Sequence, residues 1–234
     1  MSVVLAHPWF LTADARRRID GWIDAYQQRD PLGRSPTRLL LFGPADCGQR
    51  RVVEHIANEC RLPIRDISLA AWRTQAPGPR LRALRTWASE TPTVIMLRPD
   101  PWLTQPSDLL HADPWLITLL EWVDTVPNHS WAILRTPDRP RVAAIRRRFD
   151  DMLGIAAPAT DIIVEWAIST LDSSASPARV GPLAQLMAGF SWGDIVWVGA
   201  MAHTAWVTAN RLGSPLDYVS PTINNMRQQL LRDT

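Results

Sequence analysis

The sequence predicts an α/β fold in which a parallel sheet covered by helices is followed by a segment made only of helices. Short apolar runs of strand length alternate with helix-like segments as far as about residue 157, which is typical of a parallel sheet covered on both faces. After Pro158 every regular segment has helical periodicity. The composition, 46% apolar and 21% charged residues, is enough for a sizeable core. We therefore expect an α/β core over residues 1–157, whose first 36 residues hold a helix and a linker, and a helical domain over residues 158–234.

Apolar spacing and turn residues predict the first elements of the core. Residues 12–28 carry apolar side chains at helical spacing with arginines on the opposite face, and the Pro/Gly/Ser-rich stretch 30–36 ends that helix. Residues 38–42, RLLLF, form a short apolar run between turn residues, as a buried strand does. Residues 49–61 place their apolar side chains on one face and are predicted to form a helix.

The remaining elements follow the same reasoning. Asp113 and Pro114, a capping residue and then a proline at the first helical position, mark the start of a helix that runs to about Thr125. A Ser/Pro/Ala-rich linker is expected over residues 171–182. The other predicted strands are 62–69, 93–97, 131–134 and 152–156, and the other predicted helices are 79–89, 161–171, 182–188, 193–210 and 220–231.

Composition excludes several classes of function. Lys+Arg 25 against Asp+Glu 23 gives a net charge of +2, which is not the charge of a dedicated nucleic-acid binder. The sequence contains no lysine, which excludes Schiff-base chemistry, and its 12 tryptophans are scattered as packing residues would be. Cys47 and Cys60 have no metal-binding spacing, so we expect no metal site and no disulfide framework. We also expect no signal peptide, no membrane span and a cytoplasmic location.

The segment from Gly43 to Arg50 lies between a predicted strand and a predicted helix, where a phosphate-binding loop belongs. Gly43 and Gly48 keep the GxxxxG spacing that lets backbone amides face inward. A working loop also needs a lysine for the phosphates and a Ser or Thr for Mg²⁺. Gln49 and Arg50 occupy those places. The alternative is an ordinary turn between a strand and a helix.

Three segments in order along the chain are similar to the AAA+ ATPases, in particular the AAA clade of unfoldases and membrane-bound proteases. LLLFGPADCGQRRVVEHIANEC resembles the family's strand, P-loop and following helix, GFSWGDI resembles the GFSGADI of the lid, and Arg148-Phe149-Asp150 stands where the clade has GRFD. The resemblance spans nearly the whole chain. It implies a five-stranded core, a four-helix lid over 158–234 and assembly with nucleotide between subunits.

The sequence departs from the family where the family's chemistry lies. Arg98 and Pro99 follow the third predicted strand, where the Walker B motif has the aspartate that approaches Mg²⁺ and the glutamate that activates water. Trp192 replaces a glycine that the family places near the nucleotide base. Together with Gln49 and Arg50, these substitutions predict that the chain does not hydrolyse ATP at its own site and requires no cofactor. We expect a pseudo-ATPase subunit that acts through protein–protein contacts in a larger, hetero-oligomeric assembly.

Two further features carry functional hypotheses. Arg146, Arg147 and Arg148 resemble the place from which AAA+ subunits insert arginine fingers into a neighbour's site, and the alternative is a solvated charged segment. Trp72 follows the second strand about where the family has an aromatic pore loop, and the alternative is a packing residue.

The partner expected from these features is an active AAA+ protein or a multi-protein complex. Two alternative functions remain open at this point. One is an unconventional ATPase that uses arginines in place of lysine and metal. The other is a nucleic-acid-handling subunit of the clamp-loader type, against which the modest net charge counts.

Overall fold

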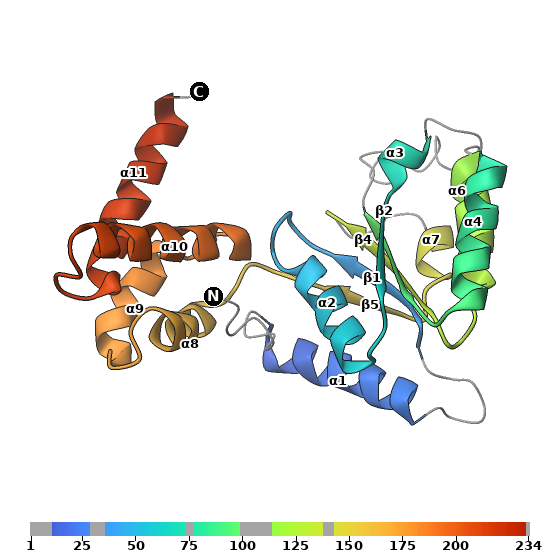
Figure 1. Cartoon of the computed structure of the whole chain (residues 1–234), viewed down its shortest axis with the longest axis horizontal. Helices are drawn as coiled ribbons and strands as arrows, with labels where there is room; N and C mark the ends of the chain where they lie inside the picture. Colours follow the sequence, from blue (N-terminus) through green and yellow to red (C-terminus); the bar gives the residue numbers. More distant parts are fainter. Residues whose placement is uncertain (1–10, 29–35, 74–76, 99–113, 138–142, 233–234) are drawn as a thin grey trace. The chain divides into compact units, whose positions relative to one another are not determined.

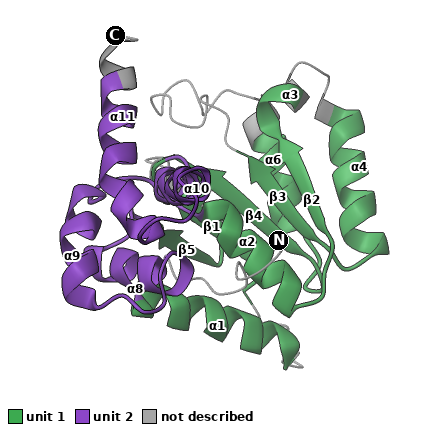
Figure 2. Ribbon diagram, turned by 60° about the vertical axis from the view of Figure 1, so that its left-hand side comes forward, with its two compact units in different colours: residues 1–6, 13–44, 49–155 green, residues 7–12, 45–48, 156–234 purple. Residues whose placement is uncertain are grey.

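A computed structural model describes residues 11–28, 36–73, 77–98, 114–137 and 143–232 of the chain. By their contacts the residues divide into two compact units, coloured separately in Figure 2. The first unit includes Ala13–Pro44 and Gln49–Ile155, and the second includes Ala45–Gly48 and Ala156–Thr234. The tip of the candidate phosphate loop is therefore part of the helical unit.

The first unit is a parallel five-stranded sheet with helices on its faces (Figure 1). The strands are β1 (Arg38–Phe42), β2 (Ile64–Ser68), β3 (Val94–Arg98), β4 (Trp131–Thr136) and β5 (Asp151–Gly154), in the order β2-β3-β4-β1-β5. The three central strands are almost wholly buried, which explains why they read as continuous apolar runs. The predicted α/β fold with a five-stranded parallel sheet is confirmed.

Helices α1 (Ala13–Gln27) and α2 (Gln49–Glu59) lie on one side of the sheet, and α4 (Pro77–Glu90), α6 (Pro114–Asp124) and α7 (Ala143–Arg146) lie on the other (Figure 1). A short helix, α3 (Leu69–Arg73), follows β2. The main apolar cluster joins α4 and α6 to the strands, with Leu84 and Trp122 among its buried side chains.

The second unit contains α8 (Thr160–Thr170), α9 (Pro177–Leu186), α10 (Trp192–Thr208), a 3₁₀ turn η2 (Pro215–Tyr218) and α11 (Val219–Arg232). Its four α-helices agree with the lid that the family resemblance implies. Helices α8 and α10 pack closely at Gly199, because a Cβ added there would lie 2.5 Å from the ring of Trp166.

The prediction for α9 was wrong at its start. The helix begins at Pro177, five residues before the predicted start at Pro182, and runs through Pro182. The side chain of Ser176 accepts a hydrogen bond from the backbone N–H of Arg179, so Ser176 and Pro177 form the capping signal that begins this helix. The expected linker accordingly ends before Ser176.

Among the described residues, no helix has the length and apolarity that crossing a bilayer requires.

Candidate functional site

The loop between β1 and α2 adopts an unusual backbone path. Gly43, Asp46 and Gly48 have φ values of 151°, 56° and 105°. A Cβ on Gly43 would lie only 1.9 Å from the carbonyl oxygen of Ile155, just beyond β5. Gly43 is therefore required by the close approach of the chain after β5, whatever the loop binds.

Gln49, which the resemblance aligns with the phosphate-binding lysine of the AAA+ ATPases, folds back into this loop. Its side chain is 3% exposed, and its Nε2 donates a hydrogen bond of 2.7 Å to the carbonyl oxygen of Gly43. Its Oε1 is buried and has no hydrogen-bond partner among the described residues. The side chain of Gln49 thus bonds the backbone of its own loop, whereas a lysine would offer a charged donor to a phosphate.

Arg50 and Arg98 both contact one carboxylate, that of Asp66 on β2. The Nε of Arg98 lies 2.7 Å from Asp66 Oδ1, and Nη1 of Arg50 lies 3.4 Å from Asp66 Oδ2. Arg50 also pairs with Glu54 one turn along α2, at 2.9 Å, and this hydrogen bond and the charge of Glu54 raise the pKa of Arg50. The structure thus brings together Arg50 and Arg98, which the sequence resemblance expects at the places of a magnesium-binding hydroxyl and of the Walker B aspartate.

Sequence reasoning missed Asp66. The available signal was an aspartate inside a predicted strand, since aspartate is depleted in strands. β2 is an edge strand, and its first three residues are exposed, so a charged side chain is tolerated there. The described residues contain no cluster of His, Cys, Asp and Glu that could hold a metal ion.

The loop tip contacts the first turn of α10 within the second unit. The backbone N–H of Gly193 donates to the carbonyl oxygen of Asp46 at 3.0 Å, and that of Trp192 donates to the sulfur of Cys47. Burial raises the pKa of the Cys47 thiol, and the hydrogen bond from Trp192 opposes part of the rise. The tip therefore satisfies two backbone donors that a helix start leaves without intrahelical partners.

Trp192 itself is packed among helices. Its side chain is 6% exposed, and its ring meets that of Trp166 edge-on, with centroids 5.7 Å apart. A capping box starts the same helix, because Ser191 and Asp194 bond each other's backbone N–H. That Trp192 stands where the family has a glycine near the nucleotide base stays a prediction.

The arginines at and after the end of α7, Arg146 to Arg148, lie in different environments. Arg147 is exposed, Arg148 forms an ion pair with Asp124 of α6, and the Nε of Arg146 is buried without a hydrogen-bond partner in the described part of the chain. Arg147 is thus the most accessible of the three, whereas Arg148, the closest sequence match to a finger, has an acidic partner.

The aspartate of the same motif has a clear structural role. Asp150 Oδ2 accepts the backbone N–H groups of Thr37 and Arg38 at 3.0 and 2.9 Å, and Asp150 also binds the guanidinium of Arg38. Phe149 is buried in the main apolar cluster. Asp150 therefore anchors the start of β1, and the positions of both residues are explained without any ligand.

Two predicted site residues cannot be placed. Pro99 lies outside the described residues, and so does the side chain of Trp72, although its backbone belongs to α3. The pore-loop role of Trp72 therefore stays a prediction.

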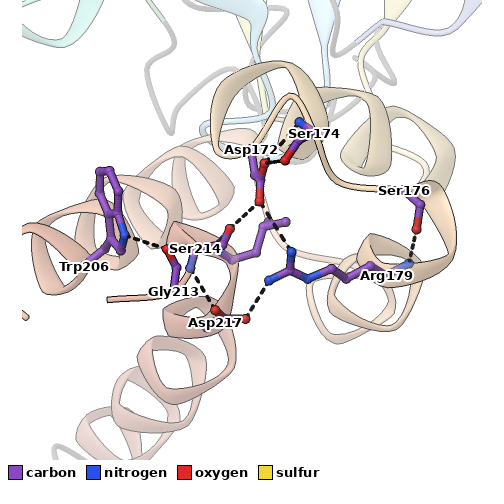
Figure 3. Close-up of polar contacts among 9 residues, drawn as sticks. Asp172, Ser174, Ser176, Arg179, Trp206, Gly213, Ser214 and Asp217 are labelled. Atoms are coloured by element: carbon purple, nitrogen blue, oxygen red, sulfur yellow. Dashed lines mark hydrogen bonds and ion pairs between the residues drawn. The ribbon is translucent and has the colours of Figure 1, made fainter. Parts of the chain in front are cut away.

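A second polar cluster, which sequence reasoning did not find, ties together two turns of the helical unit (Figure 3). Asp172 accepts hydrogen bonds of 2.6 Å from the hydroxyls of both Ser174 and Ser214. Arg179 lies 3.5 Å from Asp172 and 2.8 Å from Asp217. Hydrogen bonds lower the pKa of both carboxyls. The largest cause is the hydrogen bond from the Ser174 side chain for Asp172, and the hydrogen bond from the Ser214 backbone for Asp217. Every acidic oxygen here has a partner inside the unit, so the cluster is a structural tie.

Comparison with known proteins establishes the fold. No protein-family model matches the sequence, and no curated protein does. Among solved structures, the chain is similar to the FIGL-1 AAA domain in complex with ADP, with a TM-score of 0.70 and 18% identity, covering 95% of this chain and 84% of that one. At this identity the likeness concerns the fold, which is AAA+-like.

Proposed function

We propose that this chain is a catalytically silent AAA+-like subunit that acts through contacts with other proteins. The observation that carries the proposal is the pairing of Arg50 and Arg98 with Asp66. At the two positions where the family resemblance places magnesium ligands, this chain has guanidinium groups. They repel a divalent cation and cannot ligate it, and the nearby carboxylate is already engaged by both.

The phosphate side of the site supports the same proposal. Gln49 carries no charge, and its one described side-chain bond is spent on the carbonyl of Gly43. The similar FIGL-1 domain was solved with ADP. We propose that this chain differs from it and binds ATP and ADP no more tightly than about millimolar, because no lysine compensates the charge of the phosphates.

Hydrolysis by the purified full chain tests this proposal. We expect Mg²⁺-dependent ATP turnover at the background of the assay for the wild type and for Gln49→Lys, because restoring the lysine does not restore a metal site or a base. Turnover above background that Arg50→Ala abolishes would overturn the proposal. Arg17→Ala is the control, since Arg17 is an exposed arginine of α1 whose described ion pair is with Asp14.

We further propose that the arginine run serves a neighbour. An exposed guanidinium at Arg147, with Arg148 beside it, suits stabilisation of the charge that develops on a phosphoryl group in another subunit's site. The test uses an AAA+ protein that co-purifies with the chain, and measures its ATP hydrolysis with and without this chain. We expect stimulation, and we expect Arg147→Ala with Arg148→Ala to remove it without weakening assembly. Equal stimulation by the double variant would leave the chain as a scaffold with no part in its neighbour's chemistry.

A further inference from the structure

Strand β2 is one edge of the five-stranded sheet, with α2 and α4 on opposite sides of it (Figure 1). The backbone N–H of Val94 on β3 donates to the carbonyl oxygen of Pro63, and the parallel register continues along β2. Because backbone groups alternate in direction along a strand, the N–H and C=O of Ile64 and of Asp66 point away from β3. None of these groups bonds a described residue. Within the described structure, β2 therefore presents a row of donors and acceptors to an extended segment.

The opposite edge of the sheet, β5, is covered by side chains of α1. Nη2 of Arg18 donates to the carbonyl oxygen of Met152 at 3.0 Å, and Nε1 of Trp22 donates to Oδ2 of Asp151 at 3.0 Å. Natural proteins commonly protect an edge strand, because a free edge pairs with other chains. No side chain in the described ranges bonds the backbone of β2, so β2 rather than β5 is the edge for an added strand.

Two arginines at β2 have no carboxylate partner in the part of the chain that the structure describes. The guanidinium of Arg65 lies over the ring of Trp87 on α4, with its Cζ atom 4.9 Å from the ring centroid. Arg61, just before β2, is exposed. Trp87 thus holds the Arg65 guanidinium beside the edge and leaves its in-plane N–H groups available to an anion. Ile64 is 37% exposed and adds an apolar contact at the same edge.

The other face of β2 also carries an excess of positive charge. Arg50, Arg51 and Arg98 share two carboxylates, those of Glu54 and Asp66. Because two guanidinium groups contact Asp66, its charge does not oppose an acidic segment. Both faces of the edge therefore favour carboxylates on an added strand.

These charges distinguish the possible occupants of the edge. Paired strands bring side chains on one face to within about 5 Å of each other. A second copy paired through its own β2 would bring two edges of the same positive charge together, which opposes that dimer. An acidic segment instead places carboxylates against guanidinium groups, which bind carboxylates through two parallel hydrogen bonds. A segment of the chain itself on this edge would block an added peptide, so peptide binding to the full chain distinguishes the two.

We propose that β2 binds an extended acidic segment of a partner protein as an additional strand. The backbone of the segment bonds Ile64 and Asp66, and its carboxylates contact Arg61 and Arg65. In this mode of recognition the backbone bonds supply affinity, and the side chains beside the edge supply specificity. The inference goes beyond the proposed function, because peptide binding is measured without nucleotide and does not require a silent nucleotide site.

Fluorescence anisotropy tests the proposal with a labelled peptide of about eight alternating valines and glutamates, titrated with the full chain to about 1 mM. We expect saturable binding at 0.05 M NaCl that is weaker at 0.5 M, because salt screens the charges. Arg65→Glu reverses a contacting charge and should weaken binding about tenfold or more. Ile64→Pro should do the same by removing an edge N–H, while its bonds to β3 are kept, since proline is tolerated where its nitrogen faces away from the sheet. Arg17→Glu, the same charge change on α1, is the matched control and should bind like the wild type.

Two further peptides separate backbone bonding from charge. The same peptide with every backbone nitrogen methylated keeps its carboxylates but loses its donors, and we expect it not to bind. A peptide with lysine in place of glutamate should not bind either. Thermal unfolding of each variant checks the fold, and if Ile64→Pro unfolds, the methylated peptide decides the role of the backbone.

Several outcomes would overturn the inference. These are no binding of the valine–glutamate peptide, equal binding of the methylated or the lysine peptide, full affinity in Arg65→Glu or in folded Ile64→Pro, or an equal loss in Arg17→Glu. Tighter binding of a single-stranded oligodeoxythymidylate than of the peptide would also overturn it, because the basic edge would then serve nucleic acid.

Discussion

Replacing Asp66 with asparagine removes the negative charge with which Arg50 and Arg98 form ion pairs. Arg50 and Arg98 are 61% and 49% exposed, so each ion pair with Asp66 is worth about 0.5 kcal/mol. The loss of both, with two guanidinium groups left facing a neutral amide, is expected to lower the free energy of unfolding by about 1 kcal/mol at low salt. In a chain of this size that corresponds to a fall of about 2–4 °C in the melting temperature.

Urea unfolding at 0.05 M and 1 M NaCl measures the effect. Because ions at 1 M screen charges over about 3 Å, the difference between Asp66→Asn and wild type should shrink to less than half at high salt. Asp14→Asn is the control, since its pair with Arg17 joins two side chains that are 74% and 77% exposed and should matter little. A double-mutant cycle with Arg98→Met should give a coupling of about 0.5 kcal/mol. Equal stability of Asp66→Asn and wild type at low salt, or a rise in the wild-type melting temperature on addition of Mg²⁺, would show that Asp66 is not held by the two arginines.

Three further predictions concern the supporting structure. Asp150→Ala should lower the free energy of unfolding, measured with urea, by about 3 kcal/mol, because two backbone amides at the start of β1 and a guanidinium lose their acceptor. A decrease of less than about 1 kcal/mol would contradict this expectation. Gly199→Ala should destabilise by about 1–2 kcal/mol through its contact with the tryptophan ring of α8, whereas Gly181→Ala in α9, with nothing within 4 Å, should stabilise slightly. Asp172 and Asp217 have lowered pKa values, so the stability that their ionised carboxylates give the folded chain is present above about pH 4 and is lost as the pH falls below it. The fall in melting temperature between pH 5 and pH 3 should therefore be smaller in the variant with both residues changed to asparagine.

The parts of the fold that the sequence predicts well are those fixed by local pattern. β1 has the predicted bounds, 38–42, because its apolar run is closed at both ends by turn residues. The start of α9 was misplaced because the sequence prediction began the helix at Pro182 and assigned Pro177 to the linker, whereas the side-chain cap from Ser176 begins it at Pro177. Local pattern also located the loop from Gly43 to Arg50.

The site could be predicted only in part, because its decisive contact is tertiary. The sequence resemblance predicts that Arg50 and Arg98 stand where the family has magnesium-site residues. It does not show that one carboxylate on a third element holds both. The pairing of β2 with β3, which sets Asp66 beside Met96 and Ser68 beside Arg98, is what brings the carboxylate within reach. Such a register depends on the whole sheet and leaves no local trace beyond an aspartate in a strand.

Calorimetric titration of the full chain with ATP in the presence of Mg²⁺ measures whether the candidate nucleotide site of this AAA+-like chain is silent, as we propose. We expect no binding tighter than about millimolar, a standard free energy of about −4 kcal/mol, and the same result for Arg50→Ala. Micromolar affinity that requires Mg²⁺ and is lost in Gly48→Val would contradict the account.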